Sequence, residues 1–137
     1  MIIFKRSQIE QIFAYCRKGL PNESCGLLAG TAADNIKTVE QVYFLKNTDE
    51  SPEHFSMDIR EQFEALSKIR QEGLQLIGNF HSHPSTPSRP SKEDIRLAFD
   101  PNLSYVIVSL QDTDNPVIKS FDIKDRTAKA DQLQIME

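Results

Sequence analysis

The sequence predicts an α/β domain in which a mixed β-sheet is flanked by helices. Amphipathic segments with helical spacing occur at several places, and short apolar segments lie between them. Because the two kinds of segment alternate along the chain, the strands are expected to share one sheet. The length of 137 residues is ordinary for one domain, and neither an internal repeat nor a linker divides it. We therefore expect residues 1–137 to form a single domain.

The first part of the chain predicts one helix and two strands. In residues 7–21 apolar side chains recur every three or four positions, and a glycine and a proline mark the end. Ser7 and Glu10 have the spacing of a capping box, so the helix is expected to start there. Residues 24–30 form a short apolar segment typical of a strand, and residues 36–45 form a longer strand with imperfect alternation.

The remainder predicts two more helices and three more strands. Residues 58–73 have helical spacing, with an aspartate as the cap and a glycine at the end. An apolar strand at 74–80 runs directly into a histidine pair, and a short helix is predicted at 91–99. Residues 103–110 are apolar on both faces, which indicates an internal strand, and residues 117–123 are the last predicted strand.

Composition excludes several classes of function. The net charge of −4 and the lack of a basic cluster argue against nucleic acid as a partner. No apolar run approaches the ~20 residues that a membrane-spanning helix needs, and the first residues lack the order of a signal peptide. Cys16 and Cys25 are too few for a disulfide framework or a zinc ribbon. We expect a cytoplasmic protein without a membrane partner.

The segment GNFHSHPSTPSRPSKED, residues 78–94, carries the clearest chemical pattern. His81 and His83 end a strand, where residues two apart point to the same face. Two imidazoles on one face can converge on one cation at ~2.0–2.1 Å from each nitrogen. The alternative is a pair of polar loop residues, but the spacing at a strand end favours a metal site.

Asp94 is the candidate third ligand. Ser91 and Asp94 also have the spacing of a helix cap, which is the alternative interpretation. Three prolines between the histidines and this helix restrict the backbone and would hold the carboxylate near the imidazoles. Two histidines and one carboxylate leave a fourth position open, as in catalytic rather than structural zinc sites. The sequence therefore predicts a metal site with catalytic geometry.

A general base is needed beside such a metal, and Glu23 is one candidate among several acids. It precedes an apolar strand, but its position alone is equally typical of an exposed loop carboxylate. Other families that use His-x-His are excluded more easily. The glutamate of cupins, the Asp-His of metallo-β-lactamases and the Pro-Cys-x-x-Cys of zinc deaminases are absent. Amidohydrolase barrels need roughly 200–250 residues.

Three elements together resemble the JAMM (MPN+) metalloprotease motif: Glu-x-Cys-Gly-Leu-Leu-x-Gly from Glu23, His-Ser-His-Pro from His81, and Ser-x-x-Asp from Ser91. The resemblance spans most of the chain. It implies a curved mixed sheet flanked by helices, related to cytidine deaminases. It also implies one catalytic zinc ion held by His81, His83 and Asp94. Glu23 would be the general acid/base for the attacking water and the leaving amine, and Ser91 would donate to the oxyanion.

The resemblance further implies cleavage of a peptide or isopeptide bond after the C-terminal Gly-Gly of a ubiquitin-like protein. Asn79 departs from the family pattern, which usually has an apolar or aromatic residue there. The chain also lacks long insertions, so it resembles the small prokaryotic members that process sulfur-carrier proteins or their adducts. We expect the carrier tail to bind as an added β-strand at a sheet edge beside the zinc. The alternatives are an inactive MPN-type scaffold and a zinc hydrolase of small-molecule amides.

Overall fold

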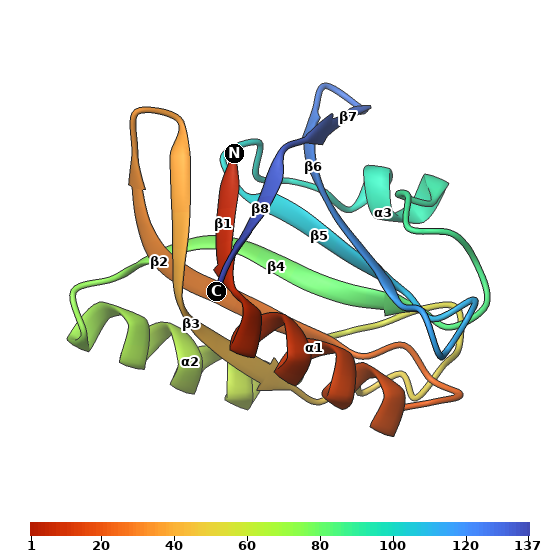
Figure 1. The fold of residues 1–137 in the computed structure, drawn as a ribbon. Coiled ribbons are helices and arrows are strands. Elements are labelled where there is room, and N and C mark those ends of the chain that lie inside the picture. Colours follow the sequence, from red (N-terminus) through yellow and green to blue (C-terminus); the bar gives the residue numbers. More distant parts are fainter.

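The computed structural model describes all residues, 1–137, and shows a curved, nearly closed sheet with helices packed against it (Figure 1). The elements in chain order are β1 (Ile2–Lys5), α1 (Arg6–Lys18), β2 (Cys25–Ala33), β3 (Ile36–Leu45), α2 (Ile59–Gln71), β4 (Gln75–His83), α3 (Lys92–Arg96), β5 (Ser104–Ser109), β6 (Val117–Lys124), β7 (Thr127–Asp131) and β8 (Leu133–Met136). The eight strands lie in the order β7-β6-β5-β4-β2-β3-β1-β8. β7 and β8 are the two ends of the sheet, yet only Gln132 separates them in the chain.

The sheet is mixed, as predicted. β1 pairs in parallel with β3 and β8, and β4 pairs in parallel with β5, whereas the remaining pairs are antiparallel. β5 is internal, which agrees with its apolar residues on both faces. β4 also has a strand on each side, so the free sheet edge that we expected beside His81 and His83 does not exist. The free edges belong to β7 and β8.

The two faces of the sheet are covered by different helices. Ile12 and Cys16 of α1 belong to the largest buried cluster, together with Phe80 of β4. On the opposite side of β2, Ala65 of α2 packs against the strand. The α3 segment, residues 92–99, packs against Ile107 of β5. Since successive residues of a strand point to opposite faces, the neighbours of Phe80 in β4 face α2 and α3. The histidine pair therefore faces these two helices.

The helix starts are partly as predicted. The carboxylate of Asp58 accepts a hydrogen bond from the Glu61 amide at 3.0 Å, so α2 has the expected cap. The predicted capping box of Ser7 and Glu10 is wrong, because α1 begins at Arg6. β1 runs into α1 without a loop, and Lys5 is the residue that precedes the helix.

Three short strands were not predicted. β1, β7 and β8 have four or five residues each, and the only apolar residues of β7 are two alanines. Such segments become strands because a neighbouring strand supplies hydrogen-bond partners, which local composition does not reveal. β4 also extends beyond the predicted residue 80 and includes both histidines.

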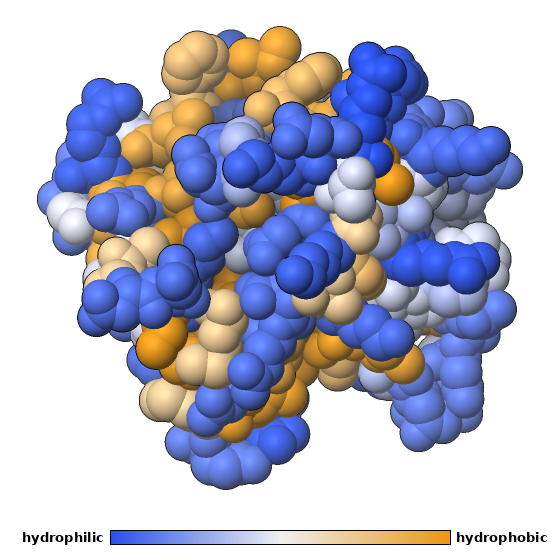
Figure 2. Space-filling view, turned by 90° about the horizontal axis from the view of Figure 1, so that it is seen from above, coloured by the Kyte–Doolittle hydropathy of each residue, from blue (hydrophilic) through white to orange (hydrophobic).

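The surface mixes polar residues with separate apolar groups. Figure 2 shows one face on which hydrophilic side chains predominate and hydrophobic ones gather in patches. None of the helices has both the length and the apolar character needed to cross a membrane. Phe99 is the most exposed large apolar residue, at 82%. It lies just after α3, on the side of the sheet that carries the histidines.

Candidate metal centre

His81 and His83 are the end of β4, where the chain leaves the sheet. Cys25 of β2 pairs with His81 on one side, and Ile107 of β5 pairs with it on the other. These pairings fix the backbone, and strand alternation then places both imidazoles on the face opposite to Phe80. Both histidines are buried. The prediction that they share one face is confirmed.

The loop after β4 brings Asp94 to the histidines. This loop is tied to β5, since the Ser88 hydroxyl donates to the Ile107 carbonyl at 2.7 Å and the Ser109 hydroxyl donates to the Thr86 carbonyl at 2.6 Å. These bonds add to the restriction that the prolines impose on the backbone. The start of α3 therefore has a defined place beside the end of β4.

The position of Asp94 is compatible with both interpretations that the sequence left open. The Ser91 hydroxyl accepts from the Asp94 amide at 3.0 Å, and Oδ2 of Asp94 accepts from the Ser91 amide at 2.9 Å, so the predicted cap is confirmed. The same Oδ2 lies 3.1 Å from Nε2 of His81 and 3.1 Å from Nε2 of His83. The capping bonds orient the carboxylate toward the imidazoles.

The three side chains fit a metal ion. The two Nε2 atoms are 3.1 Å apart, and all ligand atoms of His81, His83 and Asp94 lie within 4.8 Å of one another. Two ligands of a tetrahedral zinc ion, each at about 2.0–2.1 Å, are roughly 3.3 Å apart. Nδ1 of His83 lies 3.0 Å from the Pro87 carbonyl oxygen, which can only accept. Nδ1 therefore carries the hydrogen, and Nε2 is left for the metal.

The charges at this site depend on one another. Burial by itself raises the pKa of Asp94, but hydrogen bonds with His81 and His83 outweigh it and hold the pKa well below its usual range. Burial lowers the pKa of His83, and the contacts with Asp94 and the Pro87 carbonyl reverse this and raise it. Asp94 thus favours a proton on His83, and hydrogen bonds with both imidazoles stabilise its carboxylate. A metal ion would compete with this proton, so its affinity should fall in acid.

Glu23 lies next to this group and is not the exposed loop carboxylate that its sequence position also allowed. Its exposure is only 7%, and it directly precedes Ser24, whose backbone is bonded to Ser82 between the two histidines. Burial raises the pKa of Glu23 to about 8, with the charge of His83 lowering it and that of Asp94 raising it further. A carboxyl group with a pKa near neutrality can both accept and donate a proton under ordinary conditions.

A cleft of about 380 Å³ begins at His81 and Asp94 and runs between α2 and the α3 segment. The strand face forms its floor, and most of its lining is apolar. The lining residues are Phe55, Met57, Gln62, Asn79, His81, Glu93, Asp94, Leu97, Phe99, Tyr105, Ile107 and Ile123. Asn79 lies two residues before His81 in β4, so it shares the face of the histidines and lines the same cleft. Besides His81, Glu93 and Asp94, the polar lining residues are Asn79 and Gln62.

The profile of one protein family, described as prokaryotic homologs of the JAB domain, matches residues 5–124. The chain belongs to this family. Among the relatives of this prokaryotic JAB domain, the CysO-cysteine peptidase of Mycobacterium tuberculosis is 26% identical over 137 residues, which cover 100% of this chain and 92% of the relative. A probable TtuB-protein conjugate cleaving protease of Thermus thermophilus is 35% identical over 94 residues, covering 68% and 60% respectively.

Solved structures agree with the assignment to the JAB family. A protein from Desulfitobacterium hafniense has 51% sequence identity and a TM-score of 0.92, with 100% of this chain and 94% of that chain covered. A JAB1/MPN domain protein from Archaeoglobus fulgidus, at 24% identity, has a TM-score of 0.63 and covers 100% of both chains. The predicted family and the predicted curved α/β fold of MPN type are confirmed.

The structure of the JAB domain also reveals a loop that the sequence did not single out. Residues 46–57 join β3 to α2 and reach both elements that carry the predicted ligands. The Phe55 ring stacks on the His81 ring, with centroids 4.7 Å apart and planes at 23°. Nδ1 of His54 lies 3.0 Å from a carboxylate oxygen of Glu93, the neighbour of Asp94. His54 is the third histidine of the chain and could have drawn attention to this loop. Its contact with Glu93, however, joins distant segments and cannot be read from the sequence.

The buried Glu23 predicts a pH-dependent stability of the metal-free protein. The native state holds a proton on Glu23 between pH values of about 4.5 and about 8, whereas the unfolded chain has released it. Stability should therefore fall as pH rises through this window, by at most about 1.4 kcal/mol per pH unit before solvent screening is allowed for. Glutamine does not titrate, so the difference in unfolding free energy between wild type and Glu23→Gln isolates this contribution. Thermal unfolding in the presence of a chelator measures this difference at each pH. A difference that grows with pH would contradict the assignment.

Ser91→Ala should lose stability because the Asp94 amide loses its acceptor. The expected loss is about 0.5–2 kcal/mol, the usual cost of an N-cap deletion. Chemical unfolding of the metal-free protein measures it. Ser91→Asp supplies another capping oxygen and should recover most of the loss. If Ser91→Ala unfolds like wild type, the hydrogen bond between Ser91 and Asp94 contributes nothing measurable to the folded state.

Proposed function

We propose that this prokaryotic JAB domain is a zinc-dependent peptidase or isopeptidase. It hydrolyses the bond that follows the C-terminal Gly-Gly of a ubiquitin-like, sulfur-carrier type protein or of its adduct. The observation that carries the proposal is the convergence of His81, His83 and Asp94 beside the buried Glu23, with His81 and Asp94 also lining a largely apolar cleft. In this proposal residues 1–137 form one domain, and the protein acts in the cytoplasm.

In this proposal His81, His83 and Asp94 hold one zinc ion. When bound, zinc supplies Lewis acidity toward the scissile carbonyl and lowers the pKa of water. Glu23 takes the proton from the attacking water as its oxygen adds to the carbonyl carbon. Glu23 then passes this proton to the nitrogen of the leaving amine as the carbon–nitrogen bond breaks. A positive charge nearby favours the carboxylate form of Glu23, the form that accepts the first proton.

Ser91 has a second role in the proposed reaction. Its Oγ accepts the hydrogen bond from the Asp94 amide, and the hydroxyl hydrogen remains available to donate. A donor aimed at the oxygen on which charge develops lowers the barrier, and loss of one such donor typically costs about 10²–10³ in rate. We therefore assign to the Ser91 hydroxyl the stabilisation of the oxyanion. The same Ser91→Ala variant should thus be slow as well as less stable.

The cleft suggests how the carrier tail binds. Because β4 has no free edge, the tail cannot extend the sheet at the histidines and instead occupies the cleft between α2 and the α3 segment. An apolar lining favours apolar side chains upstream of the glycines. Glycine at the end of the tail lets the backbone approach His81 and Ser91 closely. The names of the two relatives, a CysO-cysteine peptidase and a probable TtuB-protein conjugate cleaving protease, support a protein conjugate as substrate.

Two other functions make different predictions. An MPN-type scaffold needs no metal centre, and the intact group of His81, His83 and Asp94 argues against it. A zinc hydrolase of small-molecule amides would use the same metal site, because a metal centre does not specify the acyl group. The cleft favours a longer, partly apolar substrate over a small polar amide.

The deciding experiment compares three substrates with zinc-loaded protein: a carrier protein extended beyond Gly-Gly, its isolated tail peptide, and a small glycine amide. We expect kcat/KM for the carrier to exceed that for the peptide by about 10² or more, because a globular partner adds contact area outside the cleft. Asp94→Ala is the control for contaminating proteases. Equal efficiency on carrier and peptide would favour a general hydrolase, and no cleavage of any substrate would favour the scaffold.

A further inference from the structure

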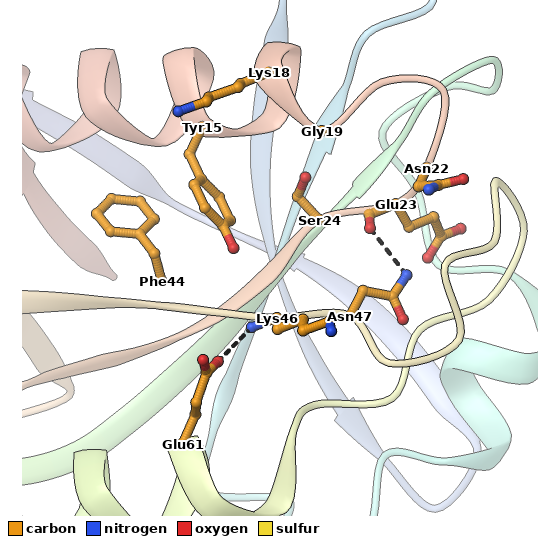
Figure 3. A pocket seen from close by; sticks show the side chains of 10 residues that line it. All are labelled: Tyr15, Lys18, Gly19, Asn22, Glu23, Ser24, Phe44, Lys46, Asn47 and Glu61. Atoms are coloured by element: carbon orange, nitrogen blue, oxygen red, sulfur yellow. Dashed lines mark hydrogen bonds between the residues drawn. The ribbon is translucent and has the colours of Figure 1, made fainter.

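The position of Glu23 depends on contacts outside the sheet. β2 begins only at Cys25, so the regular ladder does not hold residue 23. The Glu23 amide donates to the Ser51 carbonyl at 2.8 Å, and the Glu23 carbonyl accepts from Nδ2 of Asn47 at 2.9 Å. Both backbone groups of Glu23 are thus bound by the loop of residues 46–57. Figure 3 shows Asn47 reaching from the end of β3 to the Glu23 carbonyl.

The Asn47 side chain uses both of its polar ends. Nδ2 donates to the Glu23 carbonyl and, at 3.0 Å, to the His54 carbonyl. Oδ1 accepts from the Asp49 amide at 3.0 Å and from the Ser56 amide at 3.1 Å. Only a carboxamide offers two donors and an acceptor oxygen in this arrangement. Asn47 therefore closes the loop on itself and ties the closed loop to Glu23.

The loop that Asn47 closes also contacts the predicted metal ligands. Phe55 stacks on His81, and His54 contacts Glu93 beside Asp94. Phe55 and Met57 belong to the cleft wall. One side chain thus links the backbone of the proposed acid/base to the loop that borders the metal site. In enzymes, displacement of a reacting group by about 1 Å can cost on the order of 10²-fold in rate.

We propose that Asn47 is a positioning residue, which acts through Glu23 by fixing its backbone relative to the metal centre. This inference rests on the proposed role of Glu23 as acid/base. Asn47→Asp is nearly isosteric and keeps the acceptor oxygen, but it removes both donors and places a carboxylate oxygen against the carbonyls of Glu23 and His54. Repulsion between these oxygens should release the Glu23 backbone while the metal ligands keep their own supports.

The test combines kinetics with a measurement that does not need activity. For Asn47→Asp we expect kcat on the carrier fusion to fall by about 10-fold to 100-fold, with KM and zinc content near those of wild type. Ser56→Ala is the matched control, since it removes the loop bond from the Ser56 hydroxyl to Asp49 but no contact with Glu23. It should retain the wild-type kcat. Hydrogen exchange at the Glu23 amide should be faster in Asn47→Asp and unchanged in Ser56→Ala.

A double variant shows whether Asn47 acts through Glu23. If it does, Asn47→Asp should cost little in a Glu23→Gln background, because the group that it positions is already gone. Full additivity of the two losses would overturn the proposal, and so would unchanged exchange at the Glu23 amide. A rise in KM alone would reassign Asn47 to substrate binding. If wild type cleaves no substrate, the proposed function fails, and hydrogen exchange still decides whether Asn47 fixes Glu23.

Discussion

His81→Ala and Asp94→Ala proteins are expected to lose their zinc and, with it, all measurable hydrolysis. A zinc site with four ligands in a small folded domain is worth roughly 10–16 kcal/mol, so one ligand carries about 2.5–4 kcal/mol, or a factor of about 10²–10³ in affinity. The ligand atoms are already close together, with Oδ2 of Asp94 at 3.1 Å from both imidazoles. The convergent group consists of His81, His83 and Asp94, so each variant removes one of its three side chains.

Elemental analysis of dialysed protein measures this loss, and hydrolysis of the carrier fusion measures its effect. His54→Ala is the control, because it removes a histidine that is half exposed and outside the predicted ligand set. It should keep its zinc. Full zinc retention in both His81→Ala and Asp94→Ala, after dialysis against a weak chelator, would reject the assignment of this group as the metal centre.

Glu23→Gln should keep both zinc and fold but turn over about 10²–10⁴ times more slowly, the usual contribution of a positioned acid/base. The amide has nearly the same shape, but it cannot take a proton from water at neutral pH. Glu23 is also held in place through its backbone, by Ser51 and Asn47, and these bonds do not depend on its side chain. Glutamine should therefore occupy the same position.

Zinc content, melting temperature and turnover must be compared on one preparation of Glu23→Gln. Glu40→Gln is the matched control, since it makes the same chemical change at an exposed residue of β3. Its turnover should equal that of wild type. Near-normal turnover of a zinc-loaded Glu23→Gln protein would show that another group transfers the proton, and it would remove the basis for the acid/base role.

The sequence alone was sufficient for the fold class, for the longer helices and strands, and for the three side chains that converge. Helical spacing in residues 58–73 and the apolar strand before His81 are local patterns, and such patterns directly report which face of an element is buried. The pair of His81 and His83 is equally local, because strand alternation places residues two apart on one face. Asp94 could be predicted because three prolines leave the connecting loop few conformations.

Only the tertiary structure decided what surrounds Glu23. From its position it could have been an exposed loop acid, and burial against β4 and the loop of residues 46–57 is what raises its pKa to about 8. Asn47 reaches the Glu23 backbone by a hydrogen bond and Phe55 reaches His81 by ring stacking, and both contacts join segments that are distant in the chain. The strand pairing on both sides of β4 likewise excluded the expected sheet edge, and packing on the histidine face forms the cleft in which we propose that the substrate binds. Pairing, burial and contacts of this kind depend on the packing of the whole chain, which no local spacing encodes.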